Sequence, residues 1–263
     1  MKILVTGYKG LIGRKIYNTL NKLGHNVTGF DRGDKLIDQY YDMIIHCAAN
    51  CIIRDVIRDP SLTKENIDLT FDIMELARRS NCKKVILFSS SRVTHNEDNP
   101  YIASKKFLEN MARAYKDCYN IDYIIIRPET VWGRNDNPVR VIPHWISCAF
   151  DNQAIDIYGD KNKKLSPLYI DDFIIEFMKI FERFDEYKNT EPMIISGKPM
   201  LASIIANKII NVINSKSRII FLKPELTQPQ DVTVKINKNE IRLDNKFEER
   251  LKEYLLEGEK NEI

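Results

Sequence analysis

The chain has 263 residues, of which 43% are hydrophobic, and its 40 basic residues nearly balance 37 acidic ones. This length and apolar content predict one large domain, or a domain with a smaller lobe. The chain contains no block of basic residues, so its charge does not indicate a nucleic-acid partner. No apolar run approaches the roughly 20 residues that span a membrane. The five cysteines form no Cys-x-x-Cys pair, which predicts reduced thiols, a cytoplasmic location and no metal site.

The first elements alternate between strand and helix. Residues 2–6 form an apolar run that ends at a glycine, so we expect a first strand here and not a signal peptide. Apolar residues at helical spacing predict a helix over 11–23, and Gly24 is the expected stop. A second strand over 26–31 ends in an acid, and a third apolar run covers 41–49.

The same alternation continues to about residue 130. Residues 62–80 and 100–119 are predicted helices, the second with Pro100 in its first turn. Strands are expected over 83–91 and over 121–128. Runs rich in Val and Ile that alternate with helices favour a parallel sheet covered on both faces. From about residue 135 the alternation is less regular, which predicts a second, smaller lobe, and the tail from residue 244 reads as a charged helix.

The stretch TGYKGLIG places Gly7, Gly10 and Gly13 between the first strand and the first helix. Glycine there permits a positive φ and lets the backbone approach a pyrophosphate, to which the helix N-terminus offers free N–H groups. We therefore expect a dinucleotide-binding turn. Its predicted contacts are Gly7, Tyr8, Lys9, Gly10, Leu11, Ile12 and Gly13.

An acid ends the second strand, where a dinucleotide site needs a partner for the ribose hydroxyls. Asp31 stands 18 residues after Gly13, close to the usual spacing. Its carboxylate repels a 2′-phosphate and so favours NAD over NADP, whereas the neighbouring Arg32 weakens that preference. The expected fold is therefore α/β, a Rossmann-type doubly wound parallel sheet with a discontinuous C-terminal substrate lobe. We assign residues 1–134 and 168–198 to the NAD-binding domain, and residues 135–167 and 199–263 to the substrate lobe.

A candidate proton-transfer group follows in the middle of the chain. Tyr101 and Lys105 lie four residues apart, hence on one face of a helix. A free tyrosine titrates near pH 10 and a nearby ammonium favours its phenolate, so Tyr101 can exchange a proton with a substrate hydroxyl. Lys105 can also hold the nicotinamide ribose. The serines of the segment 88–91 end a predicted strand, where a hydroxyl can bond the reacting substrate oxygen.

Together these motifs resemble the extended short-chain dehydrogenases/reductases of the NAD-dependent epimerase/dehydratase family. HCAA at 46–49, DPSLTKENIDLT around Asn66, and RPETVWG at 127–133 extend the resemblance along the chain. It implies Ser90 as the catalytic hydroxyl, with Ser91 as the alternative, beside Tyr101 and Lys105. The remaining implied cofactor contacts are Cys47, Ala48, Ala49, Asn66, Phe88, Ser89, Tyr101, Lys105, Pro128, Thr130 and Val131.

The sequence also departs from the family pattern near the cofactor and the reacting sugar. Only 14 residues separate Asp31 from His46, where many relatives fit another strand and helix, so Asp34 or Ile37 is expected to form a reduced adenine wall. The dehydratases' acidic pair after the catalytic hydroxyl is replaced by Ser91 and Arg92, which argues against dehydration.

The family's diphosphate-binding arginines are also missing, since Leu165 and Gln228 stand at their positions. Lysines at 161, 163 or 164 supply charge there but not an arginine's bidentate fork. The candidate substrate contacts are Ser91, Arg92, Thr130, Lys164 and Gln228.

Three functions stay open on this evidence. The first is an NAD-dependent nucleotide-sugar 4-epimerase or 4-ketoreductase. The second is a dehydrogenase of a ketone or alcohol without a nucleotide, and the third is a non-catalytic NAD-binding regulator, for which a Ser–Tyr–Lys set has no use. The resemblance also implies a homodimer through the helices 62–80 and 100–119. Its candidate apolar contacts, which burial within the monomer would equally explain, are Phe71, Met74, Leu76, Phe107, Met111 and Tyr115.

Overall fold

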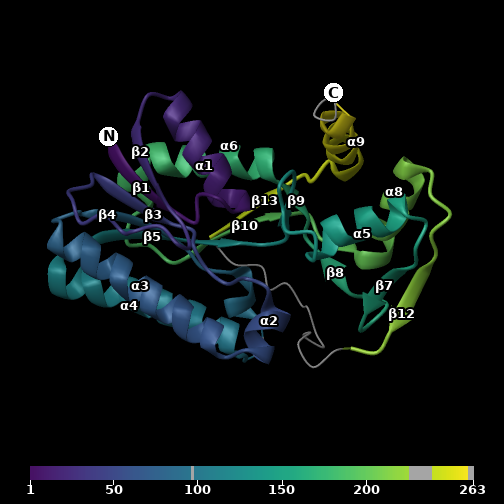
Figure 1. The fold of residues 1–263 in the computed structure, drawn as a ribbon, viewed down its shortest axis with the longest axis horizontal. Coiled ribbons are helices and arrows are strands. Elements are labelled where there is room, and N and C mark those ends of the chain that lie inside the picture. Colours follow the sequence, from purple (N-terminus) through teal and green to yellow (C-terminus); the bar gives the residue numbers. More distant parts are fainter. Residues whose placement is uncertain (96–97, 225–238, 260–263) are drawn as a thin grey trace.

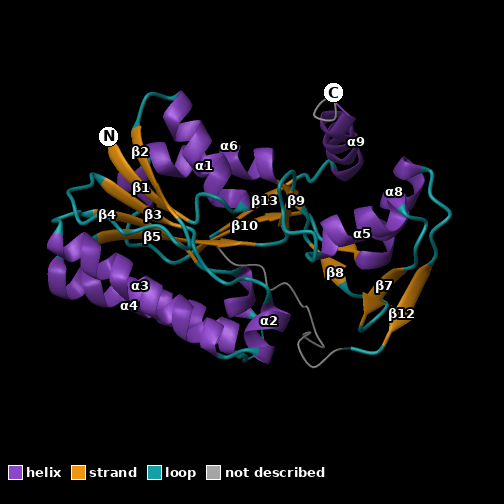
Figure 2. Ribbon diagram, viewed as in Figure 1, coloured by secondary structure: helices purple, strands orange, loops and turns teal. Residues whose placement is uncertain are grey.

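A seven-stranded, entirely parallel sheet forms the larger part of the molecule in the computed structural model, which describes residues 1–95, 98–224 and 239–259 (Figures 1 and 2). In spatial order the strands are β13 (Glu240–Leu243), β10 (Met193–Gly197), β5 (Asp122–Pro128), β4 (Lys84–Phe88), β3 (Met43–His46), β1 (Lys2–Thr6) and β2 (Asn26–Phe30). The expected parallel sheet is thus confirmed.

The strand order reverses between β1 and β3. From β1 the chain runs to β2 on one side and then returns to β3 on the other side of β1. A crevice therefore opens at the carboxyl ends of these two strands, which is where ligands bind in doubly wound sheets.

Helices cover both faces of the sheet, α1 (Leu11–Lys22) and α6 (Ile170–Glu182) on one face, and α3 (Ser61–Arg79) and α4 (Pro100–Tyr119) on the other (Figure 1). The strands are apolar on both sides because neighbouring side chains alternate between the faces. In β1, Ile3 and Val5 belong to the core beneath α1 and α6, whereas Leu4 belongs to the core beneath α3 and α4.

The smaller lobe shares the first of these cores, since Trp145, Ile155 and Ile205 pack in the same cluster as Ile3 and Val5. In Figure 2 the lobe lies beyond the carboxyl edge of the sheet. Its elements are α5 (Val141–Phe150), β7 (Ile155–Tyr158), β8 (Lys164–Leu165), β11 (Met200–Leu201), α8 (Ala202–Ile213) and β12 (Ile219–Leu222). β12 pairs with β7, and β11 with β8. Between lobe and sheet, β6 (Val131–Trp132) pairs with β9 (Leu168–Tyr169).

Two segments near the C-terminus join the lobe to the sheet. β13 falls in the range 199–263 expected in the substrate lobe, but it pairs with β10, so we place it with the large sheet. The expected tail helix is present as α9 (Phe247–Glu259). It is held by Phe247 against Trp132, with ring centroids 5.0 Å apart, and by an ion pair between Arg250 and Asp172.

Three short helical segments did not stand out in the sequence: α2 (Ile53–Arg58), the 3-10 turn η1 (Ser91–Thr94) and α7 (Phe184–Tyr187). Residues of both α2 and η1 line the cleft at the carboxyl edge of the sheet. None of the described helices is long and apolar enough to cross a membrane.

Candidate active site

The glycine turn makes a tight passage between β1 and α1. Gly7 has φ +70°, and a Cβ added to it would lie 2.7 Å from the backbone nitrogen of Ala48. A Cβ on Gly13 would lie 2.2 Å from the carbonyl oxygen of Gly7. Gly10 caps α1 without a side-chain hydrogen bond, so the first turn of the helix keeps its N–H groups for an anion. These features fit the pyrophosphate of a dinucleotide.

Asp31 lies at the end of β2, facing this turn. One carboxylate oxygen accepts the backbone N–H of Lys9 at 2.9 Å, and the other accepts that of Arg32 at 2.8 Å. Asp34, which we considered for the adenine wall, instead accepts the backbone N–H of Asp31 at 2.9 Å. Neither Asp34 nor Ile37 lines the cleft that begins at this turn.

One cleft of about 1500 Å³ runs along the carboxyl edge of the sheet and into the smaller lobe. Of the predicted cofactor and catalytic residues, all but Tyr8 line it; the ring of Tyr8 packs against Tyr17 and fills the space beside Gly29. The predicted substrate contacts Ser91, Arg92, Thr130 and Lys164 also line it. Gln228 lies outside the described residues.

Tyr101, Lys105 and Ser90 meet in the middle of this cleft. Asn99 begins α4 by accepting the backbone N–H of Ile102 at 3.0 Å, with Pro100 in the first turn, and so directs the helix toward the sheet edge. Tyr101 is 6% exposed and Lys105 is 5% exposed. Ser90 follows β4 and lies near the Tyr101 hydroxyl, whose pKa it lowers.

Burial controls the charge state of this pair. It raises the pKa of Tyr101 to about 12, although the hydrogen bond with Ser90 and the charges of Arg140 and Arg92 oppose the rise. It also lowers the pKa of Lys105 to about 8. Lys105 lies beside the Tyr101 ring on the same helix face, as the four-residue spacing predicted. Its Nζ lies 5.9 Å from the centre of the Tyr101 ring and donates to the carbonyl oxygen of Phe88 at 2.8 Å.

A buried polar layer supports α4 from behind. Glu109, one turn beyond Lys105, accepts two hydrogen bonds from Arg127 at 2.8 and 2.7 Å, and a third from the Ser89 hydroxyl at 2.6 Å. Because Arg127 lies on β5 and Ser89 follows β4, this carboxylate ties the helix to two strands. Nearby, His46 is hydrogen-bonded to Thr6 at 2.7 Å, and burial lowers its pKa to about 3.

Several charged residues that line the cleft gave no signal in the sequence. Arg140 begins α5 and forms an ion pair with Asp136 at 2.9 Å. Glu129 follows β5 with only 9% of its surface exposed, and burial raises its pKa to about 7. Glu65 lies on α3. A lone charged residue in a loop or helix carries no motif, so only the folded chain brings these side chains into the cleft.

Comparison with known proteins gives consistent results. A model of the NAD dependent epimerase/dehydratase family matches residues 3–196. The UDP-glucuronate 4-epimerase of Thermodesulfobacterium geofontis is 26% identical over 219 residues, covering 64% of this chain and 68% of that protein. The crystal structure of Thermotoga maritima UDP-glucose 4-epimerase with UDP-glucose has a TM-score of 0.81 at 18% identity and covers 100% of both chains. The crystal structure of Bacillus cereus UDP-glucuronic acid 4-epimerase, in complex with UDP-glucuronic acid and NAD, has a TM-score of 0.79 at 22% identity. This match covers 97% of this chain and 93% of that protein.

With the family model, the doubly wound sheet and its glycine turn place the chain among the NAD-dependent enzymes of the extended short-chain dehydrogenase/reductase class. The chain belongs to the NAD dependent epimerase/dehydratase family, whose model spans the sheet from β1 to β10. NAD is its cofactor.

Proposed function

We propose that the protein is a nucleotide-sugar 4-epimerase that acts through Tyr101, Ser90 and Lys105. The observation that carries this proposal is the burial of all three side chains in one cleft with the glycine turn. The UDP-sugar 4-epimerases among its relatives support epimerisation over a one-way 4-ketoreduction, which is the alternative outcome of the same chemistry.

In this mechanism Tyr101 takes the proton of the sugar 4-hydroxyl, and Ser90 donates a hydrogen bond to the same oxygen. When bound, NAD would supply the acceptor for the hydride of carbon 4 and, once reduced, the donor that returns it to the opposite face. Tyr101 gives its proton back to the 4-oxygen in the return step. Gly7 to Gly13 and Asp31 hold that cofactor. Lys105 holds its positive charge beside Tyr101, and Arg92 and Arg140 add to the field that favours the phenolate.

The decisive experiment follows interconversion of UDP-glucose, UDP-glucuronic acid and UDP-N-acetylglucosamine with their 4-epimers by NMR, without added cofactor. We expect turnover with at least one pair, and its loss in Tyr101→Phe. Tyr119→Phe is the matched control, because Tyr119 ends the same helix and is 45% exposed outside the cleft. Full activity of Tyr101→Phe would refute the mechanism.

Leu165 is the observation that favours a second candidate. This apolar residue lines the cleft where we expected an arginine for the diphosphate, which suits an alcohol or ketone without a nucleotide. A thermal-shift screen of UDP, GDP, dTDP and CDP sugars in the presence of NAD separates the two candidates. A flat response across the series, together with oxidation of a simple alcohol, supports the second one. NAD binding without hydride transfer to any of these compounds would point to a regulator instead.

We also propose a homodimer through α3 and α4. Of the candidate contacts, Met74 and Leu76 are fully buried within the monomer and Tyr115 is 6% exposed, so these three belong to the monomer core. Phe71 on α3 is 48% exposed and is the best remaining contact.

A further inference from the structure

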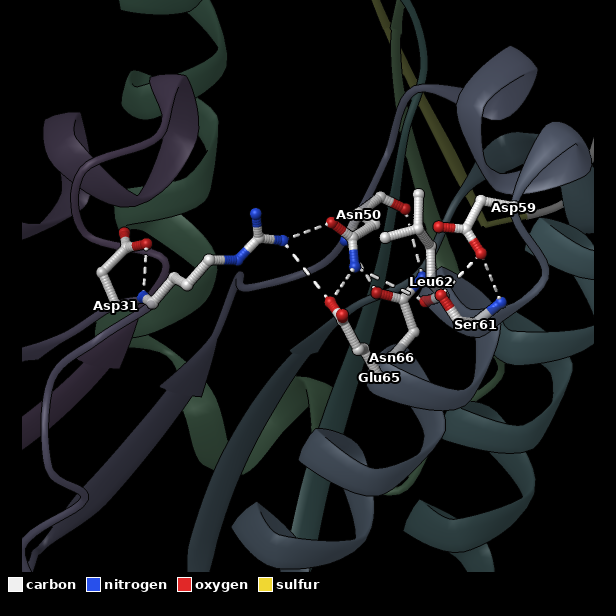
Figure 3. Close-up of polar contacts among 8 residues, drawn as sticks. Asp31, Asn50, Asp59, Ser61, Leu62, Glu65 and Asn66 are labelled. Carbon is white, nitrogen blue, oxygen red and sulfur yellow. Dashed lines mark hydrogen bonds and ion pairs between the residues drawn. The ribbon is translucent and has the colours of Figure 1, made fainter.

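Asn50 and Glu65 contact each other at the edge of the cleft (Figure 3), and Arg32, which directly follows Asp31, joins them in a polar cluster. All three residues line the cleft. The guanidinium of Arg32 donates to the side-chain oxygen of Asn50 at 2.6 Å and lies 3.5 Å from a carboxylate oxygen of Glu65. The side-chain NH₂ of Asn50 donates to that same Glu65 oxygen at 2.9 Å. Arg32 follows β2, Asn50 follows β3 and Glu65 lies on α3. The cluster therefore joins three segments around the cleft.

The Asn50 end of this cluster is firmly positioned. The side-chain oxygen of Asn66 accepts the backbone N–H of Asn50 at 2.7 Å, and its NH₂ donates to the Asn50 carbonyl at 3.1 Å. Asn66 is only 6% exposed. The start of α3 is also held, because Asp59 accepts the backbone N–H of Ser61 at 3.0 Å and its hydroxyl at 2.6 Å (Figure 3). Glu65 thus projects from a fixed turn toward Arg32.

The cluster bears on the choice between NAD and its 2′-phosphorylated form. Asp31 directly precedes Arg32 and is expected to face the ribose hydroxyls, so an unpaired guanidinium at position 32 would be well placed to bind a 2′-phosphate. In the structure that guanidinium is instead matched by the Glu65 carboxylate and held by Asn50. We infer that Glu65 is a specificity residue, which disfavours NADP by keeping Arg32 paired.

This inference rests on the family's NAD site and not on the proposed sugar substrate, so it can fail while the proposed function stands. The test is a fluorescence titration of NADH and NADPH into protein freed of retained nucleotide. It compares the wild type with Glu65→Gln, with the double variant Arg32→Gln/Glu65→Gln, and with Asp68→Asn. The last is a matched control, since Asp68 lies on α3 in the same cleft with similar side-chain exposure, 53% against 55%, but pairs with Lys64.

We expect the wild type to bind NADH more tightly than NADPH. Glu65→Gln should raise the affinity for NADPH about two- to fivefold, the range of an exposed ion pair, and leave NADH binding unchanged. The double variant should lose this gain, and Asp68→Asn should not show it. The inference is overturned if the wild type does not prefer NADH, if Asp68→Asn produces an equal gain, or if the gain persists without Arg32.

Discussion

The ammonium of Lys105 donates a 2.8 Å hydrogen bond to the carbonyl oxygen of Phe88, which joins helix α4 to the end of strand β4 inside the cleft. A neutral carbonyl compensates only part of the cost of burying this charge, and the pKa of Lys105 accordingly falls to about 8. The residue proposed to assist Tyr101 is therefore held in place, and it loses its charge as the pH rises through about 8.

We expect Lys105→Met to lower turnover about a hundredfold or more, the usual range for loss of acid–base assistance. Its stability should also differ from the wild type in a pH-dependent way. The folded pKa of Lys105, about 8, lies below the ordinary 10.5, so between these values the unfolded chain binds more protons and wild-type stability rises with pH. Urea unfolding at pH 7 and pH 10 checks this. An equal pH dependence in both proteins would contradict it.

Glu129 should show the opposite dependence on pH. Burial raises its pKa from 4.5 to about 7, so across this window the folded protein keeps a proton that the unfolded chain releases. The free energy of unfolding should therefore fall as pH rises from 4.5 to 7, by about 3 kcal/mol at most. In Glu129→Gln this contribution disappears. Parallel pH profiles of melting temperature for the two proteins would show that Glu129 is not the source.

The buried pair of Glu109 and Arg127 should be sensitive to the loss of one partner. Glu109→Gln leaves the Arg127 guanidinium without its counter-charge, which costs about 3–5 kcal/mol of unfolding free energy. The double variant Glu109→Gln/Arg127→Met should recover part of that loss, because no buried charge remains. Urea denaturation of the three proteins measures both effects. A double variant less stable than Glu109→Gln alone would contradict this account.

The proposed dimer is tested by Phe71→Glu. If α3 and α4 pair with a second copy, a carboxylate in place of the half-exposed Phe71 ring should produce a monomer. Burying an unpaired charge in an apolar contact is costly. Light scattering gives the mass of each protein. Ile175→Glu is the control, with a side chain 55% exposed on α6 across the sheet. A monomeric wild-type protein would contradict the proposed dimer.

Local sequence patterns were sufficient for the sheet and for part of the site. The Gly7–Gly10–Gly13 turn and Asp31 are tied to the ends of adjacent elements, and Tyr101 and Lys105 share a helix face through their spacing alone. These patterns depend on periodicity and chain direction, so they can be recognised without any distant contact. Such patterns are weak after residue 135, where the alternation of strands and helices is irregular. For this reason β13 was assigned to the smaller lobe, although it pairs with β10 in the large sheet.

The amino-acid sequence by itself determined the fold, the family and the elements that carry Gly7, Asp31, Ser90, Tyr101 and Lys105. Only the tertiary structure decided the charge states of Tyr101 and Lys105 and the pairing of Arg32 with Glu65. Desolvation depends on every segment that packs around a group, and Arg32 and Glu65 meet only after β2, β3 and α3 have assembled. Such contacts between distant segments leave no periodic trace in the chain.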